Sequence, residues 1–244
     1  MLGSTVLNAV LTYLRKDKRG LALSIDEFNY LSPIIDKRVL KTLTKNFEDN
    51  IDSSSETGFL KVSNWPLTLQ AGVTALPSNY YRMMGDPYYT DSGGTRRNID
   101  VVTSMERSYR EVDYLTKSTL THPTAVIGSS STAGLLQVRV MPTTIASIYV
   151  NYLRMSNVPF LDYYMDNATL QPTYMIEGET VSMAAAYTYR DGTVGVKAST
   201  TVDWEWGADE LPLIVAYFLE AIGAVIPDTL MREVGSYDKN DIEQ

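Results

Sequence analysis

The chain has 244 residues, no cysteine and a formal net charge of −8. Without cysteine it forms no disulfide and no Cys-ligated metal site, which suits maturation in a reducing cytoplasm. The acidic balance argues against a surface built to grip nucleic acid phosphates. No apolar run reaches the ~18 residues of a transmembrane helix, and we expect no signal peptide, because the first residues lack a basic segment followed by an apolar one.

The first ~50 residues read as two helices. Residues 5–15 carry one apolar stripe, made of Val6, Leu7, Val10, Leu11 and Leu14. Ser24-Ile-Asp-Glu27 has the pattern of a capping box and predicts the start of a second helix, which continues to about residue 50. Pro33 is expected to kink or divide that helix.

From residue 59 to residue 206 short β-branched and aromatic runs alternate with turn residues, which is typical of strands. We predict strands at 95–105 (loosely), 134–140, 145–153, 182–190 and 193–198, and an extended segment followed by one helical turn from Leu76. Asp191-Gly192, between two of these runs, predicts a tight hairpin turn.

The C-terminal part begins with the alternating run Val202-Asp-Trp-Glu-Trp, read as a strand with both tryptophans on one face. A helix is predicted over 211–224, with Asp209, Glu210 and Pro212 in its first turn. A short last helix is predicted over 229–237. Its apolar stripe needs a partner surface, so we expect an interface formed by Leu230, Met231, Val234 and Tyr237.

These elements define an α+β protein whose helical ends pack beside a mainly β body. The predicted division is N-terminal helices at 1–58, the β body at 59–206, and C-terminal helices with a polar tail at 207–244, all within one continuous structural unit.

No group of residues points to catalysis, a metal or a cofactor, so we expect a protein that is not an enzyme. His122, the only histidine, could act as a general base, but no nucleophile motif accompanies it. Asp203 and Glu205 resemble a glycosidase pair. The neighbouring tryptophans, however, point to the opposite strand face and cannot stack a sugar held there.

Two basic segments are candidates for anion binding. Asp91-Ser-Gly-Gly-Thr95, with Arg96 and Arg97 after it, could cradle a phosphate, but it lacks the Gly-Lys-Ser/Thr of a P-loop and reads better as a loop between strands. A second basic cluster lies at the end of the first helix and reads as a solvated face. This second cluster consists of Arg15, Lys16, Lys18 and Arg19.

Several segments, in this order, resemble the head–tail connector ring (adaptor) proteins of short-tailed phages, above all those of crAss-like phages. They span nearly the whole chain: Leu23-Ser-Ile-Asp-Glu-Phe-Asn-Tyr after an N-terminal helix, Leu76-Pro-Ser-Asn-Tyr-Tyr-Arg, Leu120-Thr-His-Pro-Thr, Val140-Met-Pro leading to Ile148-Tyr-Val-Asn-Tyr-Leu-Arg, and Val202-Asp-Trp-Glu-Trp.

The resemblance implies a helical bundle packed beside a β-sandwich or barrel-like body. It also implies a ring, commonly of twelve copies, between the portal and the tail of a virion made in the host cytoplasm. The expected partners are copies of the chain, the portal protein and adjacent tail or connector proteins. DNA would pass in transit without sequence-specific binding, and neither a cofactor nor a membrane is implied. The alternative is a tail-associated receptor- or carbohydrate-binding module, and an enzyme comes third.

Overall fold

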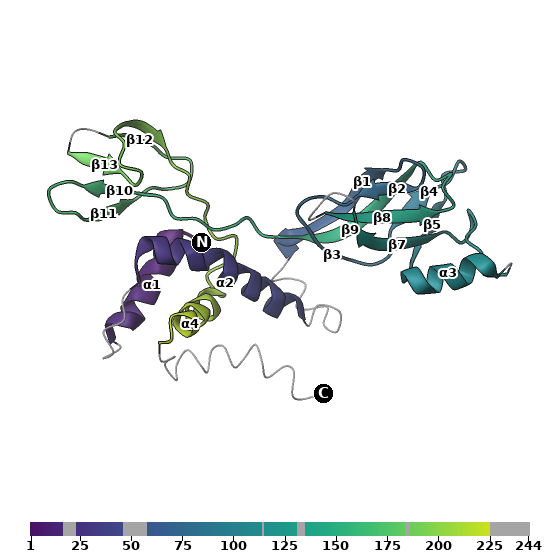
Figure 1. Ribbon diagram of the computed structural model, residues 1–244, viewed down its shortest axis with the longest axis horizontal. Coiled ribbons are helices and arrows are strands. Elements are labelled where there is room, and N and C mark those ends of the chain that lie inside the picture. Colours follow the sequence, from purple (N-terminus) through teal and green to yellow (C-terminus); the bar gives the residue numbers. More distant parts are fainter. Residues whose placement is uncertain (17–22, 46–57, 114, 131–134, 184–185, 225–244) are drawn as a thin grey trace. The chain divides into compact units, whose positions relative to one another are not determined.

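The computed structural model describes residues 1–16, 23–45, 58–113, 115–130, 135–183 and 186–224 (Figure 1). Within these residues the protein is mixed α+β, with four α-helices and several antiparallel sheets, which confirms the predicted class. The described strands do not close into a barrel.

The chain divides into two compact units, Met1–Ser53 with Ser156–Gln244 (the helical unit), and Ser54–Met155 (the β unit). This division differs from the predicted one, because residues 156–206 belong with the helices. The reason is packing: Trp204 and Trp206 from this stretch are buried, and they contact α4 and α2 respectively.

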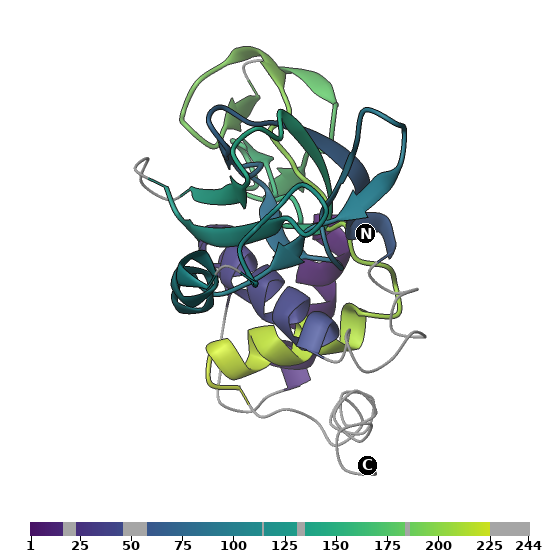
Figure 2. The same cartoon turned by 90° about the vertical axis from the view of Figure 1, so that its right-hand side faces the viewer.

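The helical unit combines three helices with two small antiparallel sheets. Its described elements are α1 (Gly3–Lys16), α2 (Ile25–Lys45), β10 (Tyr163–Asp166), β11 (Pro172–Tyr174), β12 (Thr180–Met183), β13 (Tyr187–Tyr189), β14 (Gly195–Ala198) and α4 (Leu211–Ala221). One sheet has the order β11-β10-β13 and the other pairs β12 with β14. Helix α4 contacts both α1 and α2, and Figure 2 shows the three helices side by side.

The N-terminal helices form where the sequence predicts them. On α1 the buried positions include Val6 and Val10, members of the predicted stripe. The predicted capping box opens α2: the Glu27 backbone N–H donates to Ser24 Oγ over 3.2 Å, and the Ser24 N–H donates to the Glu27 carboxylate over 2.9 Å. Pro33, which was expected to kink or divide this helix, does not divide it, because α2 runs unbroken through it.

Helix α4 begins at Leu211, as predicted, but its acidic residues lie before the helix and not in its first turn. Glu210 is the N-cap residue and Pro212 lies within the first turn, so neither Asp209 nor Glu210 is inside the helix. The end of the helix is a Schellman motif, in which Gly223 has a φ of 72°. The Gly223 N–H donates to the Glu220 carbonyl, and the Ala224 N–H donates to that of Leu219.

The segment before α4 is extended, but it is not the predicted strand. Only Val202 forms a ladder bridge, with Phe160. The predicted alternation nevertheless holds, since Trp204 and Trp206 are each 1% exposed while Asp203 and Glu205 are half-buried. Trp204 contacts Phe218 of α4 edge-on at 6.1 Å between ring centres, so this indole ties the segment to the helix.

The β unit contains two sheets that share one core. Its described elements are the 3-10 turn η2 (Gly58–Leu60), β1 (Lys61–Thr68), β2 (Val73–Ala75), β3 (Tyr80–Met83), β4 (Tyr88–Thr90), β5 (Arg96–Asn98), β6 (Asp100–Val101), α3 (Ser104–Val112), β7 (Thr124–Ser129), β8 (Leu136–Met141) and β9 (Ser147–Arg154). One sheet has the order β1-β9-β4-β5, with β3 also paired to β9, and the other has the order β2-β8-β7-β6. Ile148 and Val150 of the first sheet and Val138 and Val140 of the second lie in the same buried cluster.

Several strand predictions need correction. The predicted strand at 95–105 is two short strands followed by helix α3, and the helical turn predicted after Leu76 is strand β3. The predicted strand at 182–190 is two strands from different sheets. The Asp-Gly turn does form, with the Tyr189 N–H donating to the Thr193 carbonyl over 2.9 Å. Strands β13 and β14 on its two sides nevertheless pair with β10 and β12, because the chain leaves the turn toward another sheet.

Candidate functional site

The structure brings together two groups that the sequence placed far apart. His122 and the two arginines of β5, Arg96 and Arg97, line one open cavity of about 600 Å³, together with Asn98, Asp100 and Thr121. His122 is exposed, lies in a loop as predicted, and its backbone N–H donates to Thr119 Oγ1. Within the described residues, no serine or threonine hydroxyl is hydrogen-bonded to its imidazole.

The arginine loop uses its own carboxylate where a phosphate would bind. Asp91 accepts hydrogen bonds from the backbone N–H groups of Thr95 (2.8 Å) and Gly93 (3.0 Å), and Arg97 Nε donates to it over 3.1 Å. These contacts, the one from Thr95 first, lower the pKa of Asp91 below its ordinary value. The donors that could cradle an external anion are therefore engaged within the loop.

The carboxylate pair of the 202–206 segment holds neighbouring segments in place. The Gly3 backbone N–H at the start of α1 donates to Asp203 Oδ1 over 2.9 Å, which places a negative charge at a helix N-terminus. Glu205 accepts from the backbone and side-chain N–H groups of Asn157 at 3.1 and 3.0 Å. Since the indoles lie on the other face, these contacts give the two acids a structural role and not the geometry of a sugar site.

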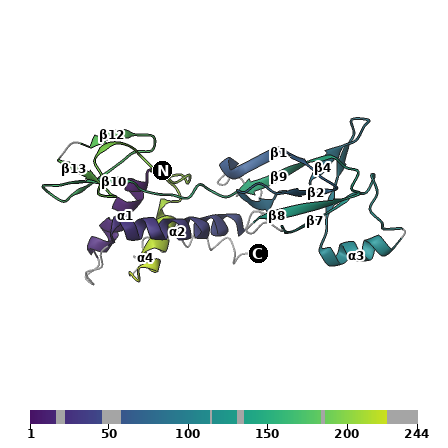
Figure 3. The same ribbon diagram turned by 45° about the horizontal axis from the view of Figure 1, so that its top comes forward.

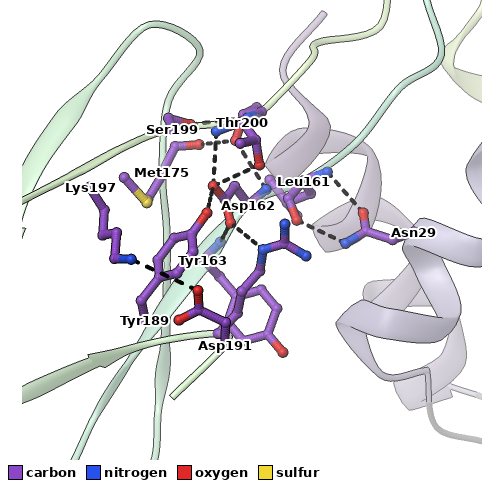
Figure 4. A network of polar contacts seen from close by, with 12 residues as sticks. Asn29, Leu161, Asp162, Tyr163, Met175, Tyr189, Asp191, Lys197, Ser199 and Thr200 are labelled. Carbon is purple, nitrogen blue, oxygen red and sulfur yellow. Dashed lines mark hydrogen bonds and ion pairs between the residues drawn. The ribbon is translucent and has the colours of Figure 1, made fainter. Parts of the chain in front are cut away.

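The most buried charge of the described residues is Asp162, which the sequence analysis missed (Figure 4). Its Oδ2 accepts from the Tyr189 hydroxyl at 2.5 Å and from the Thr200 N–H and hydroxyl, both at 2.9 Å. Its Oδ1 accepts from the Tyr163 N–H and forms an ion pair with Arg190 Nε, both at 3.0 Å. Burial alone would raise the pKa of Asp162, but the hydrogen bonds outweigh it and the pKa is lowered.

The Asp162 network joins the small sheets to helix α2. Next to Asp162, the Leu161 N–H donates to Asn29 Oδ1 over 2.8 Å, and Asn29 Nδ2 donates to the Leu161 carbonyl over 2.9 Å (Figure 4). Thr201 Oγ1 donates to the Met175 carbonyl and accepts from the Asp162 N–H. With both carboxylate oxygens occupied, Asp162 has no open side for a reacting group, and the network is a structural joint.

A second buried carboxylate, Asp36 of α2, holds the tryptophan segment. It accepts from Trp206 Nε1 over 2.7 Å and from Ser156 Oγ over 2.5 Å. Burial raises the pKa of Asp36, and these two hydrogen bonds only partly oppose that effect. Asp36 thus fixes Trp206 against the helices of this unit.

The strongest candidate for a binding surface is helix α3, which lies beside β7 (Figure 3). Its apolar residues Met105, Tyr109 and Val112 recur at i, i+4 and i+7 and form one stripe, called here the α3 stripe. They are 67%, 66% and 90% exposed, and α3 buries no residue at all. Such a helix displays to solvent the side that a surface helix normally packs inward.

The other side of α3 is polar and ordered. Arg107 pairs with Glu111 over 2.9 Å, and Arg110 pairs with Glu106 over 2.7 Å. Thr103 caps the helix by accepting the Glu106 N–H over 3.1 Å. A groove of about 410 Å³ separates this polar side from β7 and β8, with Arg107 and Glu111 among the residues that line it. The α3 stripe is therefore exposed on a helix that its own N-cap and ion pairs hold in place.

Some predicted residues cannot be placed. Leu230, Met231, Val234 and Tyr237 lie outside the described residues, as do Lys18 and Arg19 of the basic cluster.

Within the described part of the chain, no cluster of three or more His, Cys, Asp or Glu side chains could hold a metal ion. No helix in that part is both long and apolar enough to cross a membrane.

Comparison with known proteins gives no relative: the sequence matches no family model and no curated protein at a significant level.

Proposed function

We propose that this protein is a virion structural protein, a ring-forming subunit of a head-to-tail connector through which a phage genome passes. The proposal starts from the ordered segments that resemble connector proteins of short-tailed, crAss-like phages. We also propose the finer fold of that family, a bundle of N- and C-terminal helices beside a β-sandwich. The contacts of α4 with α1 and α2, and the shared core of the two larger sheets, support it.

The observation that carries the proposal is the α3 stripe. Three large apolar side chains on a nine-residue helix are exposed, and so short a helix gains little stability by itself in water. Exposed apolar surface of this kind marks interaction sites on soluble proteins. A subunit of an assembly needs such a surface, whereas Asp36, Asp91 and Asp162 are engaged in structural contacts.

The distribution of charge fits a subunit of a DNA conduit. The helical unit has 12 Lys and Arg against 22 Asp and Glu, a net charge of −10, while the β unit has 9 against 7, a net charge of +2. An acidic unit repels DNA and would let it pass without adhering. This pattern supports transit of DNA without sequence-specific binding.

The test is assembly. The purified chain, alone and mixed with the portal protein of the same phage, is analysed by native mass spectrometry and averaged electron micrographs. The proposal expects closed rings, commonly of twelve copies, that attach to the portal. A chain that stays monomeric in both conditions would refute it.

One observation favours the second candidate, a receptor- or carbohydrate-binding module. Tyr88 and Tyr149 stack at 5.2 Å between ring centres, and the Arg96 guanidinium lies 3.8 Å from the Tyr88 ring centre. Aromatic rings on a sheet can bind sugars. Here, however, Arg96 and Tyr149 already cover Tyr88, so the ring has little free face. Binding of the monomer to host cells or glycans, lost in Tyr149→Ala, would favour this candidate.

A further inference from the structure

A second apolar row lies on α2, in the helical unit. Tyr30 and Ile34 are 74% and 48% exposed and stand one helical turn apart. Lys37 and Lys41 continue the same row at i+7 and i+11 from Tyr30, and both are exposed. The buried residues of α2, such as Phe28 and Ile35, occupy other positions. These four residues, Tyr30, Ile34, Lys37 and Lys41, are called here the α2 row.

The α2 row and the α3 stripe stand out from the other helices. Of the four described α-helices, only α2 and α3 carry large apolar side chains that are exposed. Both sets follow the i, i+4 spacing that forms ridges on a helix surface, and ridges of this kind pack into the grooves of a second helix. Each set is too small to be a stable interface alone, because specific interfaces bury about 800 Å² per partner.

We propose that the α3 stripe of one copy docks on the α2 row of a neighbouring copy, as part of the side-to-side contact of the ring. The inference rests on the proposed function and names the surfaces that join its subunits. Because the two surfaces are different patches of the chain, the contact is heterologous. Such a contact repeats from copy to copy and forms a ring when the rotation between copies closes, whereas a self-complementary patch stops at a dimer.

Charge identifies a second copy as the occupant. The lysines of the α2 row, Lys37 and Lys41, would meet Asp113, the exposed acid that follows Val112 at the end of the α3 stripe. The net charges of the two units favour the same pairing. A helical unit of net charge −10 repels another helical unit but not a β unit of net charge +2. The α3 stripe and the α2 row thus match in spacing, apolar character and charge.

Cross-linking tests the contact directly, because the chain contains no cysteine of its own. The double variant Ile34→Cys/Tyr109→Cys is assembled and treated with a short bis-maleimide. Head-to-tail docking predicts a ladder of covalent dimers, trimers and larger species on a denaturing gel. The matched control is Ile34→Cys/Val196→Cys, which places the second cysteine at another exposed apolar position (71% exposed) and should give no ladder.

A charge substitution on the α3 stripe provides the second measurement. Tyr109→Lys should leave the circular dichroism spectrum and the melting temperature of the monomer unchanged, because Tyr109 is exposed, and it should weaken ring assembly at least tenfold. Val196→Lys should assemble like the unsubstituted chain.

The outcomes separate the two proposals. If the unsubstituted chain forms no ring, alone or on the portal, the proposed function fails and the docking fails with it. If rings form but the double variant gives no ladder, or Tyr109→Lys assembles as tightly as before, only the docking is overturned.

Discussion

Replacing Asp162 with asparagine tests whether the buried network holds the helical unit together. The carboxylate accepts four hydrogen bonds and one ion pair, from Tyr163, Tyr189, Arg190 and Thr200. An asparagine oxygen can replace Oδ2, but its NH₂ group then faces the Tyr163 N–H and Arg190, both donors. The unsatisfied Tyr163 N–H costs about 1–3 kcal/mol. The lost ion pair adds less than the about 3–5 kcal/mol of a fully buried pair, because the Arg190 side chain is 37% exposed.

We therefore expect Asp162→Asn to lower the free energy of unfolding by about 3–5 kcal/mol. For a chain of 244 residues this corresponds to a fall in melting temperature of roughly 10 °C. The assay is urea denaturation at pH 7, with thermal melting alongside it. The matched control is Asp166→Asn, on the same strand: Asp166 accepts the Ala168 and Thr169 N–H groups through a single oxygen, which asparagine retains.

The pH dependence gives a second check on Asp162. Its pKa is lowered in the folded protein from an ordinary value of 3.8. Its contribution to stability is therefore fully present above about pH 4 and is lost as the pH falls through the lower folded value. The difference between the unsubstituted chain and Asp162→Asn should shrink in that acidic range. Equal melting temperatures at pH 7 for the Asp162 and Asp166 variants would refute the structural role.

Three other predictions concern the helical unit. Trp204→Ala should lower the free energy of unfolding, measured in urea, by about 3–5 kcal/mol, as for a buried large aromatic. Trp65→Ala, at a site 46% exposed, should lower it clearly less. Equal losses for the two variants would contradict the burial of Trp204. The pKa of Asp36 is raised, chiefly by burial, so its ionised form destabilises the fold as the pH rises from 3.8 through the raised value. Asp36→Asn should therefore gain stability relative to the unsubstituted chain as the pH rises above about 4, and a difference that does not change with pH would exclude this. Gly223→Ala should lower the free energy of unfolding, followed by thermal melting, by about 1–2 kcal/mol, because the φ of this residue is 72°. No atom lies within 4 Å of an added Cβ, so the loss is conformational and not steric. An unchanged melting temperature would argue against the Schellman motif.

The sequence predicts best where the signal is local. The stripe of α1 and the Ser24–Glu27 box of α2 depend on residues within one or two turns, and both form as expected. The alternation of indoles and acids over 203–206 is also local, and it survives even though the ladder expected around it is reduced to one bridge. Pairing between distant segments is not encoded in this way. The Asp-Gly turn therefore predicted a bend correctly and a hairpin wrongly.

The candidate surface and the buried network were missed for related reasons. The segment containing α3 begins with Val101 and Val102, which favour a strand, whereas the helix is held by its cap and by ion pairs, one of them between Arg110 and Asp100 of the neighbouring strand. Asp162 gives no signal in its own neighbourhood, because Tyr189 and Thr200 lie 27 and 38 residues away. Only the folded chain shows that these partners converge.

The helical unit is discontinuous in sequence, and this has a consequence for synthesis. The Met1 backbone pairs with that of Trp204, 203 residues later, with the Trp204 N–H donating to the Met1 carbonyl over 2.9 Å. At about 5–20 residues per second, a ribosome needs roughly 10–40 s to make the second partner after the first. During that interval the whole β unit is synthesised, while the apolar sides of α1 and α2 still lack α4, the helix against which they pack. The β unit is thus the part of the chain that can fold first, and the N-terminal helices are the part that needs protection from aggregation on the ribosome.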